Sequence, residues 1–86
     1  MLSETVHDLK VIPSFFCAIK SGMKGFEIRR NDRKFQVGDV IMLREYNDGH
    51  YTGRIVLGKI TFVTDFEQKE GYVVFNFKRV RVDEAV

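Results

Sequence analysis

The sequence predicts one small α+β domain, in which closely spaced strands curl into a β-barrel and a single short helix follows the first strand. The chain has 86 residues, which is enough for one domain and too few for two ordinary ones. Short segments rich in β-branched and aromatic residues recur between tight turns, as in curled or closed sheets. Only one segment has the spacing of a helix with a buried face. We therefore treat residues 1–86 as a single domain whose helix plugs one end of the barrel.

The first expected strand covers residues 5–12, where apolar and polar side chains alternate imperfectly. Pro13 ends this strand and suits the first turn of a helix, because its fixed φ angle and missing N–H are tolerated there. The helix is expected over residues 14–21, and Gly22 stops it, as a glycine at the C-terminal end of a helix does. The side chains expected on its buried face are Phe15, Phe16, Cys17 and Ile19.

Residues 26–29 alternate strictly and predict the second strand. Phe26 and Ile28 are expected to face the core. Glu27 and Arg29 would then share the opposite side, with their Cα atoms about 6–7 Å apart because of the rise of a strand.

Turn signals divide the rest of the chain into further strands. The expected elements are turns at residues 31–32 and 36–39, a strand over 40–46, a hairpin turn at 47–49, a long strand over 51–63 and a last strand over 72–77 that runs on to 82. A long strand must bend in a small barrel, and Gly53 and Gly58 mark the places where we expect bulges.

The formal net charge of +2, from 14 Lys and Arg against 12 Asp and Glu, is too small to indicate a nucleic-acid partner by itself. What matters is whether the positive charge is segregated. Residues 29–34 hold four basic side chains against one Asp, and Lys78, Arg79 and Arg81 form a second basic cluster. If the two clusters meet on one face, they form a nucleic-acid patch that the net charge conceals. The alternative is that each cluster is a solvated edge, where Lys and Arg deter aggregation.

The single cysteine, Cys17, excludes an internal disulfide and a cysteine-rich zinc site. It is expected to be buried, since a free thiol behaves as a small hydrophobe. His7 and His50 lack the neighbouring ligands typical of a metal site, so we expect neither a metal nor another cofactor. The longest apolar run, residues 15–19, is too short to span a membrane, and no basic-then-apolar leader precedes it, so we expect a cytoplasmic protein.

Three stretches of the chain, taken together, resemble a known family. They are residues 7–11, 21–29 and 31–39. The middle stretch contains the pattern Gly-x-Lys-x-x-Glu-x-Arg, formed by Gly22, Lys24, Glu27 and Arg29, which resembles the signature of ASCH domains, relatives of the PUA RNA-binding fold. The fuller pattern, through residues 43–46 and 51–54, resembles a bacterial and phage branch of this superfamily that is named only as a domain of unknown function. The resemblance extends from His7 to Val74.

This resemblance implies a five- or six-stranded mixed barrel, with a cleft lined by the loop after the helix and by the following strand. Members of the superfamily are regarded as RNA-binding, and one small bacterial group hydrolyses the amide of N4-acetylcytidine. That group uses a lysine, a threonine three residues later and a distant glutamate. Lys24 matches the lysine, but Glu27 stands where the threonine would be. The nucleophile is therefore missing, and the carboxylate would have to act as general base on a water.

Lys24, Glu27 and Arg29 are the main candidates for a binding site. Such a set can hold a base edge together with an anion, because Glu accepts from an amino group while Arg and Lys hold a phosphate or carboxylate. The alternative is an exposed ion-pair ladder across neighbouring strands, in which each pair contributes under about 1 kcal/mol.

Other candidates for the ligand-binding set lie outside this signature. Asn31 and Arg33 follow the second strand, although Asn31 can simply cap the turn together with Asp32. Arg44 and Arg54, on successive strands, face either Glu45 or the cleft. The aromatic side chains that can stack on a base are Phe35, Tyr46, His50 and Tyr51. The alternative for each of them is a place in the core, with the two tyrosines paired across the hairpin turn.

These observations support three hypotheses. The first is a binding domain that recognises RNA, or a nucleotide within it, through Lys24, Glu27, Arg29 and neighbouring basic residues. The second is a small amidohydrolase of a modified nucleoside, in which Glu27 activates water and Lys24 stabilises the oxyanion. The third is a protein-interaction domain, encoded by a phage, that binds a host factor. We expect no membrane partner under any of them.

Overall fold

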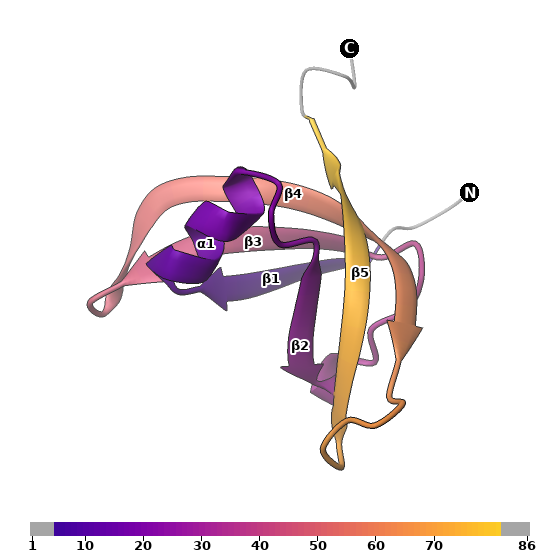
Figure 1. The fold of residues 1–86 in the computed structure, drawn as a ribbon. Coiled ribbons are helices and arrows are strands. Elements are labelled where there is room, and N and C mark those ends of the chain that lie inside the picture. Colours follow the sequence, from indigo (N-terminus) through magenta and orange to yellow (C-terminus); the bar gives the residue numbers. More distant parts are fainter. Residues whose placement is uncertain (1–4, 82–86) are drawn as a thin grey trace.

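The computed structural model describes residues 5–81, which form one curled five-stranded sheet with a single α-helix packed on it (Figure 1). The elements are, in chain order, β1 (Val6–Val11), α1 (Pro13–Lys20), β2 (Phe26–Arg30), the 3₁₀ helix η1 (Asn31–Arg33), β3 (Val40–Asn47), β4 (His50–Thr64) and β5 (Tyr72–Val80). The expected fold class is confirmed at the level of a small, mostly β domain with a barrel-like sheet and one short helix. No helix within residues 5–81 is both long and apolar enough to cross a membrane.

The strands are ordered β1-β3-β4-β5-β2, so β1 and β2 form the two edges of the sheet. Among the described strands, β1 and β3 run parallel and the other neighbouring pairs are antiparallel. Figure 1 shows β4 arching over the molecule, which turns the sheet from the direction of β1 and β3 into that of β5 and β2. The result is a half-barrel in which the edge strands are not ladder partners. We call the gap between β1 and β2 the seam.

The ladders of β4 are interrupted at two places. Gly53, with a φ angle of 96°, lies where the register with β3 shifts between Arg44 and Tyr46. A second shift, in the ladder with β5, falls between Ile60 and Phe62. Extra residues of this kind bend a strand and increase its twist, which is what closure of the sheet requires. The expected bulge near Gly53 is confirmed.

Gly58 has a different role from the expected one. The register around it is continuous, so it is not a bulge. A Cβ at this position would lie 2.8 Å from Cδ2 of Phe77 and 3.3 Å from Cγ1 of Ile41. The missing side chain therefore lets neighbouring strands pack closely on the inside of the bend.

The core lies inside the half-barrel and under α1. Its fully buried apolar side chains come from every strand except β2, from α1 and from the loop before β3. They are Leu9, Val11, Phe16, Ile19, Phe35, Ile41, Leu43, Val56, Ile60, Val73 and Phe75.

Only part of the predicted buried face of α1 is buried. Phe16 and Ile19 are in the core, whereas Phe15 and Cys17 are exposed. An eight-residue helix on a sheet presents one narrow stripe to it, and residues three apart share that stripe while their neighbours turn about 100° away. The prediction of a buried Cys17 is therefore wrong. Gly22, with a φ angle of 85°, donates its N–H to the carbonyl of Ile19 and ends the helix as expected.

The side chains of β2 face the opposite way from the prediction. Glu27 is 4% exposed and pairs in register with the buried Phe75, so it faces the inside of the half-barrel. Phe26 and Ile28 are 41% and 54% exposed, and the prediction that they face the core is wrong. Alternation shows which residues share a side but not which side is inside. At the seam the inside carries polar groups.

Candidate ligand-binding site at the seam

Two arginine side chains bridge the seam. Arg29 Nη2 donates to the carbonyl oxygen of Lys10 at 2.7 Å, and Arg33 Nη1 donates to that of Asp8 at 2.7 Å. In an edge strand, every second residue points its backbone N–H and C=O groups away from the neighbouring strand. Asp8 and Lys10 are such residues of β1, and their carbonyl oxygens point toward η1 and β2. The half-barrel is thus closed at this edge by side chains instead of a ladder.

Glu27 joins the bridge to the loop after α1. Its Oε1 accepts from Arg29 Nε at 2.9 Å, and its Oε2 accepts from Lys24 Nζ at 2.5 Å. Lys24 Nζ also donates to the carbonyl of Phe26 at 2.6 Å. Because Glu27 is buried, this trio is not the exposed ladder considered as the alternative. The sequence-predicted residues Lys24, Glu27 and Arg29 are brought together in one place.

An apolar hollow of about 470 Å³ opens beside this trio. Its wall combines the trio with Lys10, Arg30 and apolar side chains from β1, α1, the residue between them, β2 and β5. The apolar members are Val11, Ile12, Phe15, Phe26, Ile28 and Tyr72. Exposed large apolar side chains around a few convergent polar groups are typical of small-ligand sites.

A second hollow, of about 410 Å³, adjoins the bridge and is cationic. Its wall is formed by Asp8, Lys10, Arg29, Arg33 and Tyr51. The carboxylate of Asp8 is engaged by Arg44, whose Nη1 lies 3.0 Å from Asp8 Oδ2. The hollow therefore contains three cations and one carboxylate that is already paired.

The two hollows share Lys10 and Arg29. We call the pair of hollows the seam site. Arg29 has five N–H donors and uses Nε and Nη2 within the protein, so its other donors remain for a ligand. Each oxygen of Glu27 has a second lone pair as well. The arrangement can hold an anion in one hollow and a flat, partly apolar group with hydrogen-bond donors in the other.

Of the two predicted tyrosines, Tyr51 lines the cationic hollow and Tyr46 packs against Tyr51. Tyr46 and Tyr51 form an edge-to-face pair with ring centroids 5.0 Å apart, which confirms the expected pairing across the hairpin. Lys10 Nζ lies 4.5 Å from the centre of the Tyr46 ring, and the guanidinium of Arg44 lies 3.7 Å from that of Tyr51. These cation–π contacts join Tyr46 to Lys10 of the hollow, and Tyr51 to Arg44, which pairs with Asp8.

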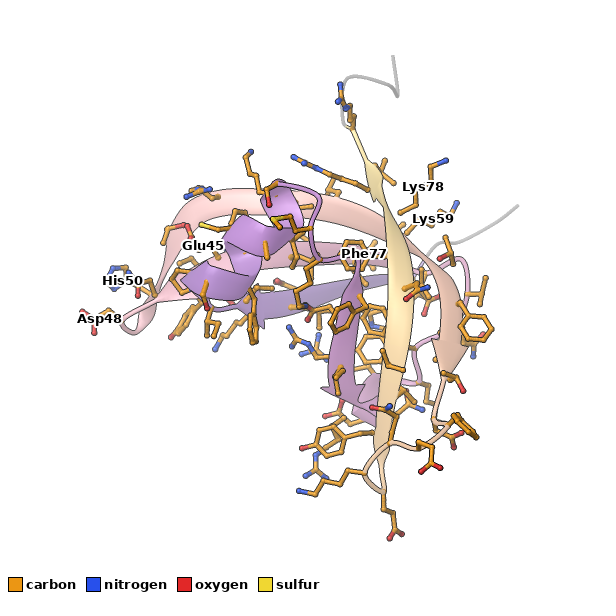
Figure 2. The ribbon with its side chains drawn as sticks, viewed as in Figure 1. Glu45, Asp48, His50, Lys59, Phe77 and Lys78 are labelled. Atoms are coloured by element: carbon orange, nitrogen blue, oxygen red, sulfur yellow. The ribbon has the colours of Figure 1, made fainter. Side chains whose placement is uncertain are left out.

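Other predicted candidates lie elsewhere. Asn31 Oδ1 accepts from the N–H of Phe35, so Asn31 caps its turn, which was the alternative interpretation of this residue. Phe35 is in the core against Phe75. Arg54 lies 3.7 Å from Glu45 and 5.0 Å from the ring of Phe16, so it faces Glu45 and not the seam site. Figure 2 shows His50 at the tip of the β3–β4 hairpin beside Asp48.

Two further buried polar groups are satisfied within the fold. His7 Nε2 donates to Asp39 Oδ2 at 2.8 Å, and the same oxygen accepts from the N–H of Gln36 in the turn before β3. Glu45 accepts from Thr52 Oγ1 at 2.7 Å. In the part of the chain that the structure describes, no three His, Cys, Asp or Glu side chains gather in a way that could hold a metal ion.

Two residues of the second predicted basic cluster, Lys78 and Arg79, line a separate hollow together with Lys59, whereas Arg81 does not line it. Among residues 5–81, none lines both this hollow and the seam site. Arg79 Nη1 donates to the carbonyl of Lys20 at the end of α1. The two clusters thus belong to different hollows of the molecule.

Several residues that line the seam site were not predicted from the sequence. Lys10 and Asp8 come from β1, and Phe15 and Tyr72 come from α1 and β5. The alternation of residues 6–11 marks Asp8 and Lys10 as neighbours on one side of a strand. Nothing local indicates that this side faces β2.

Residues 6–77 match the family described as Domain of unknown function (DUF3850). The chain is also 36% identical over 72 residues to a protein of Escherichia phage P2 described as an uncharacterized 12.9 kDa protein in the GpA 3′ region. This match covers 83% of the chain and 66% of the phage protein, so the chain spans slightly less than two thirds of that relative. Both findings agree with the expected domain of unknown function with phage members. Neither bears on the relation to ASCH or PUA-like domains, which stays a prediction.

Proposed function

We propose that this chain, which belongs to the family described as Domain of unknown function (DUF3850), binds single-stranded RNA, or a nucleotide within it, at the seam site. The observation that carries the proposal is that an apolar hollow and a cationic hollow share the wall formed by Lys10 and Arg29. One nucleotide has a flat base and an anionic phosphate at its two ends. The resemblance of residues 22–29 to the ASCH signature supports the same class of ligand.

The apolar hollow has the features that a base needs. Phe15, Phe26 and Tyr72 supply ring surface, and bases stack on such rings or on an arginine guanidinium. Arg30 holds its guanidinium 5.4 Å from the centre of the Tyr72 ring at the rim. The oxygens of Glu27 can accept from the amino group of a base, which would favour bases that carry one.

The cationic hollow suits a phosphate. Arg33 uses one of its five donors on the carbonyl of Asp8, and Arg29 also keeps donors for a ligand. Guanidinium groups bind phosphate oxygens with paired hydrogen bonds. Lys10 adds an ammonium group that is held over the Tyr46 ring. The three cations come from β1, β2 and η1, so the folded half-barrel is needed to bring them together.

The geometry supports binding better than hydrolysis. In the amidohydrolase hypothesis Lys24 would stabilise the oxyanion, but its ammonium group already donates to Glu27 Oε2 and to the carbonyl oxygen of Phe26. We therefore expect no release of acetate from N4-acetylcytidine. Turnover that disappears in Glu27→Gln would favour the hydrolase instead.

Fluorescence anisotropy with an end-labelled single-stranded RNA of about ten nucleotides tests the proposal. Arg33→Gln should weaken binding about three- to tenfold, because it removes one phosphate contact. Phe26→Ala should weaken it by about tenfold through lost stacking. Lys78→Gln is the matched control, since it removes the same charge from a surface outside the seam site, and it should bind like the unchanged protein.

The result that contradicts the proposal is specific. If Arg33→Gln and Lys78→Gln weaken binding equally, the RNA responds to overall charge and has no site at the seam. Absence of binding at low salt by the unchanged protein would also contradict it.

A further inference from the structure

The hollow at the C-terminal end of β5 differs in chemistry from the seam site. It has a volume of about 490 Å³ and lies between the β4–β5 ladder and the turn at residues 36–39. Its apolar members are aliphatic: Ile60 is buried at its floor, while Val37 and Val80 are exposed at 63% and 39%. An exposed aliphatic surface of this kind is suited to burial against a partner.

Cations surround this aliphatic surface. Lys59 of β4 and Lys78 of β5 are directly opposite in the ladder, and Arg79 follows Lys78. Figure 2 shows the side chains of Lys59 and Lys78 projecting from the two strands in the same direction. A carboxylate that approaches Lys78 is attracted by this ammonium group and by the guanidinium of the adjacent Arg79, and among residues 5–81 no acidic side chain lines the hollow.

We infer that this hollow is a docking site for a partner protein, and that it takes a peptide segment in which an aliphatic side chain is flanked by Asp or Glu. The aliphatic side chain fills the space over Ile60 between Val37 and Val80, and the flanking carboxylates pair with Lys78 and its neighbours. Charge complementarity selects an acidic partner, and the apolar floor selects one that buries an apolar side chain.

The same lining argues against a nucleic acid at this place. In the described part of the chain, residues 5–81, no aromatic side chain lines the hollow, whereas the seam site has several. Sequence-tolerant binding of single-stranded nucleic acid relies on stacking of bases on aromatic rings. An aliphatic floor with cations at the rim offers a base no ring, but it matches a peptide such as Asp-Glu-Ile-Leu-Asp-Glu.

Amide chemical shifts of the full chain test the inference, with that hexapeptide as the probe. The peptide should shift the amides of Val37, Gly38, Thr61 and Lys78 in a saturable manner and leave those of Arg29 and Arg33 unchanged. The matched peptide Asn-Gln-Ile-Leu-Asn-Gln should bind at least about threefold more weakly, because it keeps the aliphatic residues and loses the charge.

Variants separate the two contributions. Lys78→Gln should weaken peptide binding about three- to tenfold, and Val37→Ser should weaken it by about as much, since both side chains are exposed and neither change disturbs the core. Arg33→Gln is the control that should leave peptide binding unchanged. In the RNA-binding experiment at the seam, Arg33→Gln is the test variant and Lys78→Gln is the control, which is the reverse of their use here. Each proposal can therefore fail without the other.

Three outcomes overturn the inference. The first is that the peptide shifts none of these amides. The second is that single-stranded RNA of about ten nucleotides shifts them while the peptide does not, which would make the hollow part of a nucleic-acid track. The third is that dilution of the protein alone shifts them, which would assign the hollow to a second copy of the chain.

Discussion

Glu27 accepts hydrogen bonds from two cations, Lys24 and Arg29, in a place where all three side chains are largely shielded from solvent. Removing the charge of Glu27 leaves both cations without their partner. Breaking one side of a buried ion pair costs about 3–5 kcal/mol, and partial exposure of Arg29 lowers that cost. We expect Glu27→Gln to reduce the free energy of unfolding by about 2–4 kcal/mol, as measured by urea denaturation.

Asp8 provides the control for this prediction. Its carboxylate also pairs with an arginine, Arg44, but the Asp8 side chain is 48% exposed. Exposed pairs contribute under about 1 kcal/mol, so Asp8→Asn should change stability little. Equal losses for Glu27→Gln and Asp8→Asn would show that the buried trio is not the structural centre of the seam.

At the scale of elements, Gly58 shows how the bend of β4 is accommodated. A methyl group there would lie 2.8 Å from the ring of Phe77, a residue of the neighbouring strand that is partly buried and packs against the core. Overpacking of this kind costs about 1–3 kcal/mol. We expect Gly58→Ala to lower stability by that amount in thermal or urea unfolding.

Gly25 is the matched position for this change. A methyl group at Gly25 would have no other atom within 4 Å, and the φ angle of this residue is not in the left-handed region. Gly25→Ala should therefore be close to neutral. If Gly58→Ala is also neutral, the sheet can relax at the bend and the close approach is not a constraint.

The elements also show what local sequence determines. The hairpin at Asp48-Gly49 was predictable, because both residues have positive φ angles and this dipeptide favours such a turn. The grouping of the charged side chains of Lys24, Glu27 and Arg29 could be predicted from the sequence, because it depends only on one strand and the preceding loop. The inward direction of Glu27 was not, since it depends on pairing with β5, far along the chain. The contribution of β1 to the seam site could not be predicted from the sequence for the same reason. β2, which lies across the seam from β1, does not pair with it in the sheet.

At the scale of the whole molecule, two arginine side chains take the place of the ladder that would close the barrel. Arg33 holds β1 by one hydrogen bond to the carbonyl of Asp8. A hydrogen bond from a charged donor that is exposed contributes about 1 kcal/mol. We expect Arg33→Gln to raise the hydrogen-exchange rates of the β1 amides about fivefold, relative to those of β4 in the same sample. Lys78→Gln should leave β1 unaffected, and unchanged β1 exchange in Arg33→Gln would mean that the bridge does not hold the seam.

The distribution of charge over the molecule leads to the last prediction. The net charge is only +2, but Lys10, Arg29 and Arg33 converge on one hollow, and part of the charge of Arg29 is offset by Glu27. A one-nucleotide site there neutralises one or two phosphates, and each phosphate contributes about 0.7 to the slope of log Kd against log salt concentration. Kd for RNA should thus rise only about 3- to 7-fold between about 50 and 200 mM salt. A slope of about 4 or more would require contacts over several faces, including the cations beside β5, and would contradict a one-nucleotide site at the seam.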